Sequence, residues 1–460
     1  MNRNDPRMIL LATSIGSVIV MLDTSIVNVA LERISQDLGG GVTDLQWIVN
    51  SYVLLFASLL LSGGALGDVF GARRVYVTGL VVFTAASFVS GCAPGIWVLI
   101  AGRVLQGIGA ALLVPCSLAL LTQTYPNGTA RAKAIASFSG WGGVALVIGP
   151  LVGGLLVTVF DWRSIFLVNV PFGLAGIWLT LRTGHQATEH GSRRIDLAGQ
   201  SSLAIAIILM TTALIEGAKL GWGSTWVIAA FAIGLVSACA FIVIERRSRS
   251  PMLPLHLFSN STFSLICYVF LSGATAFFGM LFVLSLFFQQ GRGYTPLQTG
   301  FALLPLSVGV VIGNTASGKL VSRFDPLRLM LMGSGIRLIG FTTMIFAGTE
   351  ISRPVIEAQL LLVGLGAGLG SPMSTSIFMS TVGRSYTGIA SGIARSTGQV
   401  GSAFGIAIFG SLLPAAHDSS EALSVAAFLA AAVTASILAI NVYLLFHSGF
   451  ERESRIPEVK

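Results

Sequence analysis

Long runs of apolar residues, separated by short polar stretches, follow one another along the whole chain. A helix that crosses the hydrocarbon core of a bilayer needs about 20 such residues. Runs of this kind are centred near residues 19, 55, 83, 109, 145, 173, 207, 234, 275, 308, 338, 366, 399 and 434. The pattern predicts an all-α polytopic membrane protein with about 14 transmembrane helices. The fifth and thirteenth runs are rich in Gly and Ser and are the weakest of the set.

The composition agrees with a chain that is solvated by lipid. Hydrophobic residues make up 54% of the 460 residues and charged residues only 10%, whereas about a quarter of a soluble domain is charged. The four cysteines are scattered singly, without the spacing of a metal site or redox pair. The first run, from Met8 to about Ala30, is too long for a signal-peptide core, so we expect it to remain as the first span.

The basic residues predict the orientation of the spans. If the N-terminus is cytoplasmic, nineteen of them fall on the inner side and five on the outer side. The inner set is Arg3, Arg7, Arg73, Arg74, Arg131, Lys133, Arg182, Arg193, Arg194, Arg246, Arg247, Arg249, Lys319, Arg323, Arg328, Arg384, Arg452, Arg455 and Lys460, and the outer set is Arg33, Arg163, Lys219, Arg292 and Arg353. Because cytoplasmic loops are enriched in Lys and Arg, both termini are predicted to be cytoplasmic. The net charge of +8 therefore lies in short loops and does not indicate binding of nucleic acid.

Two distant parts of the chain resemble each other. The segment Gly64–Arg74 (GALGDVFGARR) shares Gly, Leu, Phe and Arg with Gly318–Arg328 (GKLVSRFDPLR) at an offset of 254 residues. The tripeptide Ile-Ala-Ser at 135–137 recurs at 389–391 with the same offset. The repeat predicts two six-helix bundles in the same orientation, at 1–182 and 257–460, with a loop and two-helix insert at 183–256. Parallel repeats around a central site are a transporter architecture.

Four motifs resemble those of the major facilitator superfamily and, within it, the fourteen-span drug:proton antiporters. They are Leu22–Ala30 (LDTSIVNVA), Gly64–Arg74, Arg103–Gly109 (RVLQGIG) and Gly149–Gly154 (GPLVGG). The resemblance covers nearly the whole chain. It implies two bundles that rock against each other, and export of small molecules in exchange for protons.

Asp23 is the one acidic residue well inside an apolar run, where a carboxylate costs about 2.5–3.5 kcal/mol. Counted from the outer ends of their spans, Asp23 and Arg103 both lie roughly 9–10 Å deep, since a helix rises ~1.5 Å per residue. Equal depth permits an ion pair. The pair is either a static lock between two helices or, as the resemblance implies, the site of proton coupling.

The resemblance assigns the loop of Gly64, Asp68, Gly71, Arg73 and Arg74 to a cytoplasmic gate. The alternative is a capping acid followed by a positive anchor. The chain departs from the family pattern at Val69 and Ala72, where basic residues are common, which predicts a thinner latch.

Gly149, Pro150, Gly153 and Gly154 match the antiporter motif, which the resemblance links to prevention of leak and to export. Ordinary packing of small residues is the alternative.

Asn28, Gln106, Arg337 and Arg395 are candidate cavity residues. Relatives more often carry Asn where Arg395 stands and Arg where Gly398 stands. The aromatic residues around Phe277 either line an apolar cavity or pack against lipid.

We therefore expect a proton-coupled exporter of amphipathic or cationic organic compounds, acting as a monomer in the bacterial cytoplasmic (inner) membrane. A same-fold exporter or importer of one metabolite is the alternative. The sequence lacks a phosphate-binding loop and a catalytic constellation, so we expect no enzyme activity, metal or cofactor. The expected partners are substrate, protons and lipid.

Overall fold

The structure is a computed structural model that describes residues 6–125, 128–183, 196–248, 252–347, 351–383 and 386–453. Over these ranges it is helical and contains no β-strand. The fourteen long helices are α1 (Pro6–Ile26), α3 (Val42–Phe70), α4 (Ala72–Gly91), α5 (Ile96–Thr124), α6 (Gly128–Val159), α8 (Asn169–Arg182), α9 (Leu197–Leu220), α10 (Thr225–Arg247), α11 (Ser261–Leu286), α12 (Pro296–Leu320), α13 (Pro326–Met344), α14 (Arg353–Ser380), α15 (Thr387–Leu412) and α16 (Ser419–Glu453). Shorter helical pieces are η1 (Val27–Ala30), α2 (Leu31–Leu38), α7 (Ser164–Leu167), η2 (Leu255–Ser259), η3 (Phe287–Gly291) and η5 (Leu413–Ala415).

Each of the fourteen predicted centres falls inside one of the long helices. Twelve helical segments in the described ranges are long and apolar enough to cross a membrane. The two long helices outside that set are α13 and α15, so α15 is weak as predicted, whereas α6 is strongly apolar. The first span also differs from expectation, because α1 ends at Ile26 and continues as the short pieces η1 and α2.

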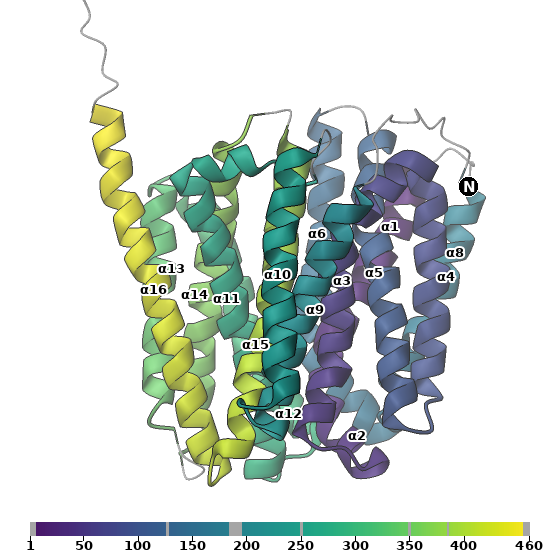
Figure 1. Ribbon diagram of the computed structural model, residues 1–460, viewed down its shortest axis with the longest axis vertical. Coiled ribbons are helices and arrows are strands. Elements are labelled where there is room, and N and C mark those ends of the chain that lie inside the picture. Colours follow the sequence, from purple (N-terminus) through teal and green to yellow (C-terminus); the bar gives the residue numbers. More distant parts are fainter. Residues whose placement is uncertain are drawn as a thin grey trace, which may run out of the picture.

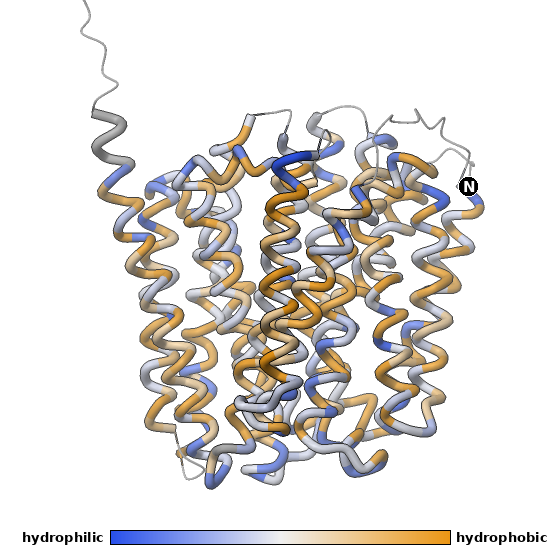
Figure 2. Tube along the Cα trace, in the orientation of Figure 1, coloured by the Kyte–Doolittle hydropathy of each residue, from blue (hydrophilic) through white to orange (hydrophobic). Residues whose placement is uncertain are grey.

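The helices stand side by side and both described ends of the chain lie at the same end of the molecule (Figure 1). We call the end at which α1 begins the inner end and the opposite end the outer end. Hydrophobic residues colour the shafts of the helices, and hydrophilic residues gather towards the two ends (Figure 2). The basic residues Arg3, Arg193, Arg194, Arg249, Arg384, Arg455 and Lys460, and residues 184–195 of the predicted insert, lie outside the described ranges.

Local sequence explains several helix starts. The side chain of Asp196 accepts a hydrogen bond from the backbone of Gly199 at the start of α9, and Asn260 caps α11 in the same way. Thr295 and Gln298 form a capping box at the start of α12. Side chains of this kind satisfy backbone donors that have no partner within the helix.

Helices α1 to α8 and α11 to α16 use the same packing partners in the same order. In the first set α3 and α4 pack on α5, α6 packs on α1, and α8 contacts α1 and α4. In the second set α12 and α13 pack on α14, α15 packs on α11, and α16 contacts α11 and α13. We refer to these two sets as the N-terminal half and the C-terminal half. Their equivalent packing is what an internal repeat requires.

The two halves meet along two helix pairs, α3 with α15 and α6 with α12. The predicted insert is the pair α9 and α10, and α9 contacts both α3 and α15 along their shared edge. Two polar contacts attach α9 to the N-terminal half, because Gln200 donates to the carbonyl of Ser58 and Trp47 donates to Glu216 at 2.8 Å. The insert therefore covers one seam between the halves and is hydrogen-bonded to α3.

Candidate functional site

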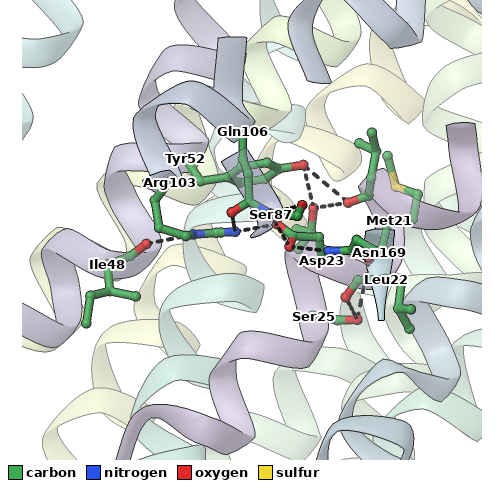
Figure 3. Close-up of polar contacts among 12 residues, drawn as sticks. Met21, Leu22, Asp23, Ser25, Ile48, Tyr52, Ser87, Arg103, Gln106 and Asn169 are labelled. Carbon is green, nitrogen blue, oxygen red and sulfur yellow. Dashed lines mark hydrogen bonds and ion pairs between the residues drawn. The ribbon is translucent and has the colours of Figure 1, made fainter. Parts of the chain in front are cut away.

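Asp23 of α1 is the centre of a buried polar network (Figure 3). Arg103 of α5 forms an ion pair with Asp23 through its Nη1 and the carboxylate Oδ2. The other oxygen, Oδ1, accepts from Nε2 of Gln106 at 3.0 Å and from Nδ2 of Asn169 at 3.1 Å. The side chain of Asp23 is 0% exposed and that of Arg103 1%. One carboxylate thus connects α1, α5 and α8.

A second set of contacts holds Arg103 and Gln106 in place. Arg103 donates through Nε to the carbonyl of Ile48 at 3.0 Å and through Nη1 to Oε1 of Gln106 at 2.9 Å. Its guanidinium carbon lies 4.3 Å from the centre of the Tyr52 ring. Gln106 donates in turn to Oγ of Ser87 in α4 at 2.8 Å. The ion pair is therefore part of a hydrogen-bonded cluster that includes α3 and α4.

The three side chains that contact the Asp23 carboxylate all act as donors, which suits the ionised form because it has only acceptors. A protonated carboxyl group carries an O–H donor and has less acceptor capacity, so it matches three neighbouring donors less well. Asp23 is also closed off from solvent in this conformation. Access from solvent to Asp23 therefore requires a rearrangement of the helices that enclose it.

The glycines of the predicted antiporter motif allow α6 to lie directly on α1. A Cβ at Gly149 would come within 1.8 Å of Oγ of Ser25, and one at Gly153 would come within 2.7 Å of Cγ1 of Ile26. The hydroxyl of Ser25 could rotate away, but a Cβ at Gly153 would also lie 2.9 Å from the carbonyl oxygen of Ile26, so α1 would have to move. The motif is thus a close packing surface on the wall of the helix that carries Asp23.

The same motif also contacts the C-terminal half. A Cβ at Gly154 would lie 2.5 Å from the carbonyl oxygen of Pro296 at the start of α12, and one at Gly300 would lie 2.6 Å from that of Pro150. These four residues lie at the outer end of α6 and α12. The backbones of the two halves are therefore in direct contact there.

Further contacts close the outer end between α3 and α15 and between α2 and η3. Gln46 donates to the carbonyls of Ile406 and Ala407 at 3.0 and 2.9 Å. Gln290 donates to the carboxylate of Glu32 at 2.5 Å. The halves are thus joined at the outer end by polar contacts as well as by the glycines of α6.

Nearer the inner end, two exposed glycines of α6 and α12 make no such contact. A Cβ at Gly143 of α6 or at Gly318 of α12 would meet no heavy atom within 4 Å beyond its own helix. A cavity of about 400 Å³ lies on this side, lined mainly by the six helices α11 to α16, with Leu146 of α6 at its edge. The closed outer end and the inner cavity describe one state of a two-bundle protein.

The predicted gate loop is shorter than expected, because only Gly71 lies between α3 and α4. Gly64 and Asp68 belong to the end of α3, and Arg73 and Arg74 belong to the first turn of α4. Gly71 has φ +92°, which L side chains rarely adopt, so the turn requires glycine. Asp68 and Arg74 are exposed, and a Cβ at Gly64 would meet only Pro115 at 3.6 Å.

Arg73 of this loop is bound to the end of α8. Its Nε and Nη2 donate to the carbonyl of Thr180, and Nη2 also donates to those of Leu181 and Thr183, all at 3.0–3.2 Å. The last carbonyls of a helix have no partners of their own, so Arg73 caps α8. In this conformation its hydrogen bonds stay within the N-terminal half.

The predicted cavity residues separate into different environments. Arg337 lines the cavity on the inner side. Asn28 is buried at the outer contact between the halves, where its carbonyl accepts from Ser285, and Gln106 is enclosed in the Asp23 network. Neither of these two lines that cavity. Arg395 is exposed on α15 and does not line it either, although its neighbour Ala394 does.

Sequence reasoning missed three residues that shape the site. Asn169 and Ser87 belong to the Asp23 network. Both are single polar residues in apolar runs, so their depth in the membrane could have been compared with that of Asp23, as was done for Arg103. Gly63, and not Gly64, makes the close contact with α5, because a Cβ there would lie 2.0 Å from the carbonyl oxygen of Ala111. Adjacent glycines cannot be told apart from sequence, since the helix face decides which one is packed.

Fold and site together define a polytopic helical membrane protein with two similarly packed halves. The family model described as Major Facilitator Superfamily matches residues 13–406. The chain belongs to this superfamily.

Several curated proteins resemble it over most of their length. The chain is 37% identical over 410 residues to Multidrug resistance protein Stp of Mycobacterium tuberculosis (strain CDC 1551 / Oshkosh), which covers 88% of the chain and 75% of the relative. It is 33% identical over 447 residues to Methylenomycin A resistance protein of Bacillus subtilis (strain 168), covering 96% of the chain and 95% of the relative.

A solved structure supports the fold. The nucleoside transporter NupG aligns with a TM-score of 0.66 at 9% identity, covering 97% of this chain and 99% of that one. At such low identity the likeness shows the fold alone.

Proposed function

We propose that the chain is a proton-coupled secondary-active exporter of amphipathic organic compounds, drugs and antibiotics among them, in the bacterial cytoplasmic membrane. The observation that carries the proposal is the fully buried Asp23, held by donors from two other helices and paired with Arg103. Resistance proteins among the relatives, including the Tetracenomycin C resistance and export protein of Streptomyces glaucescens, support export as the direction of transport. In this reading the chain belongs with the fourteen-span drug:proton antiporters, and α13 and α15 are spans like the other twelve helices.

The proposed topology places the inner end in the cytoplasm. An even number of spans agrees with the common end at which α1 begins and α16 ends. The described basic residues Arg73, Arg74, Arg131 and Lys133 lie in or beside inner-end connections. With the positive-inside rule, this arrangement supports cytoplasmic termini and a working unit of two bundles, 1–182 and 257–460, with the insert 183–256 between them.

Coupling follows from the donor-only surroundings of Asp23. In the present state the carboxylate ties α1 to α5 and α8. A proton that arrives from outside neutralises Asp23 and weakens the tie to Arg103, which biases the equilibrium between the two arrangements of the halves. Each proton that enters supplies about 2.3 kcal/mol per 100 mV of membrane potential, together with any pH gradient.

The glycine motif supplies the seal in this proposal. Contacts of Gly154 and Gly300 with backbone atoms close the outer end. While it is closed, no continuous path through the protein is open along which protons or substrate could leak. The loop of Asp68, Gly71 and Arg73 is proposed to form its latch in the opposite state, when the inner ends approach each other. This role adds to the cap that Arg73 provides in the present state.

The test uses everted membrane vesicles with an acidic lumen. A susceptibility screen of a pump-deficient host that expresses the chain first identifies a substrate. Adding that substrate to vesicles with the wild-type protein should release protons from the lumen, followed with a fluorescent pH probe. Asp23→Asn should abolish this release, while Asp161→Asn, which removes an exposed outer carboxylate, should leave it unchanged. Undiminished uphill transport by Asp23→Asn would refute the coupling role.

A further inference from the structure

The cavity on the inner side carries a single charge. Its lining combines apolar and aromatic groups, Phe277 and Phe278 among them, with small polar side chains such as Ser334, Asn314 and Asn441. Arg337 is the one ionisable residue in the lining. A volume of about 400 Å³ falls in the range of small-molecule sites, and an apolar wall with a few polar groups is their usual composition.

Arg337 has no partner within the described part of the chain. It makes no hydrogen bond or ion pair there, and its buried Nε is unsatisfied, although only 8% of the residue is exposed. The terminal nitrogens lie against Gly273, where a Cβ would be 3.5 Å from Nη1 and 3.9 Å from Nη2. The absence of a side chain at Gly273 therefore leaves room beside the guanidinium.

A second buried polar atom without a partner among the described residues belongs to another residue that lines this cavity. Asn441 of α16 donates to the carbonyl of Met330 and to Oγ of Ser334, at 3.3 and 3.1 Å, but its Oδ1 accepts nothing among the described residues. Buried polar groups are normally satisfied by protein, water or ligand. The unpaired guanidinium of Arg337 and the unpaired Oδ1 of Asn441 thus belong to two residues that line one cavity, which indicates a place for a polar ligand group.

We propose that Arg337 forms a subsite for the anionic group of the substrate, and that the transported compounds are amphipathic organic anions such as aromatic carboxylates. The planar guanidinium presents donors in a fork that matches a carboxylate. The rings of Phe277 and Phe278 then contact the apolar body of the compound. The inference rests on the proposed function and names the substrate class for the same transporter.

The proposal revises the expected preference for cations. Asp23 is the one acidic residue that the sequence places well inside an apolar run, and its carboxylate is paired with Arg103. The lining of the cavity contains no carboxylate and one guanidinium. A cationic compound would meet an unscreened like charge there, whereas an anion would supply the missing counter-charge.

The test compares two probes of equal shape with the full chain in lipid nanodiscs. Naphthoate is an anion at neutral pH, and naphthamide is its neutral counterpart. Equilibrium dialysis with radiolabelled probes should show that the wild-type protein binds naphthoate at least about tenfold more tightly than naphthamide, since a hydrogen-bonded charge adds at least that much. Arg337→Gln should remove the preference and retain binding of naphthamide, which shows that the cavity is intact.

Two further variants separate charge at this site from charge in general. Arg337→Lys should keep part of the preference, because the charge remains and the fork is lost. Arg395→Gln removes an arginine from the neighbouring helix α15, outside the cavity lining, and should leave the preference unchanged. Raising the chloride concentration of the buffer tests whether a simple inorganic anion occupies the subsite.

Three results would overturn the proposal: no preference for naphthoate in the wild-type protein, an unchanged preference in Arg337→Gln, or complete displacement of naphthoate by chloride. The proposed function fails separately. If the anion preference is found but no substrate releases protons from vesicles, the subsite stands without proton-coupled export. If vesicles respond to substrate but Arg337→Gln changes nothing, export stands and the anion subsite does not.

Discussion

The two halves each bury an arginine, and the surroundings of the two arginines are opposite. Arg103 in the N-terminal half contacts a carboxylate, an amide oxygen, a backbone carbonyl and an aromatic ring. Arg337 in the C-terminal half contacts no acceptor within the described ranges and borders a cavity. The repeat therefore preserves helix packing while the chemistry of the two halves has diverged.

The difference suggests a division of labour. A closed network around Asp23 suits a group that binds and releases a proton, because a small ion needs little space. An open cavity with one unpaired charge suits a larger ligand that brings its own counter-charge. Under our two proposals, the N-terminal half binds the coupling proton and the C-terminal half selects the substrate. Each of the following predictions tests this contrast.

The largest effect is expected from removing the partner of Asp23. Arg103→Gln leaves a carboxylate buried without its counter-charge, which should destabilise the protein by about 3–5 kcal/mol. The double variant Asp23→Asn/Arg103→Gln replaces both charges by amides and should recover much of that loss. Thermal unfolding in one detergent compares the stability of the wild-type protein, the single variant and the double variant. Equal stability of Arg103→Gln and the wild-type protein would mean that the N-terminal network is not a closed unit.

The second effect concerns the outer contact of the halves. Gly154→Ala places a Cβ 2.5 Å from a backbone oxygen of α12, and backbone cannot yield as a flexible side chain can. Overpacking of this kind costs about 1–3 kcal/mol, which should shift the equilibrium away from the closed outer end by about 5–150-fold. Uphill transport in vesicles should fall accordingly.

Gly143→Ala is the matched control on the same helix, because a Cβ at Gly143 meets open space. Its transport should equal that of the wild-type protein. If both variants transport normally, the glycine motif contributes ordinary packing and no seal.

The third prediction is a change in stability opposite in sign to that expected for Arg103→Gln. Arg337→Gln removes a buried charge that has no described partner, so the apo protein should keep its stability or gain about 1 kcal/mol. The same thermal unfolding assay provides the measurement. A loss of several kcal/mol would show that Arg337 is a structural charge, and the contrast between the halves would not hold.

The sequence predicted the helices well because the bilayer imposes a length and a polarity on every span. Asp23 and Arg103 were paired from their depth alone, since helix rise is regular. Depth alone does not tell which face of a helix a polar residue lies on, so it could not show that Asn169 and Ser87 point towards Asp23. Whether Arg337 pairs with a carbonyl or faces a cavity depends on the rotation of α13 against α14 and α16, which no local pattern encodes.

The smallest effect tests a feature that only the N-terminal half possesses. Arg73 binds the last carbonyls of α8, whereas the position equivalent to Arg73 in the repeat, 254 residues later, is Leu327. Arg73→Ala should cost about 1 kcal/mol, since the hydrogen bonds are partly exposed, and hydrogen exchange should accelerate at the end of α8. Arg74→Ala, at the exposed neighbouring position, should leave that exchange unchanged. If Arg73→Ala slows transport without altering hydrogen exchange in α8, the loop acts mainly as a latch. If hydrogen exchange in α8 rises and transport is normal, capping of α8 is the main role of Arg73.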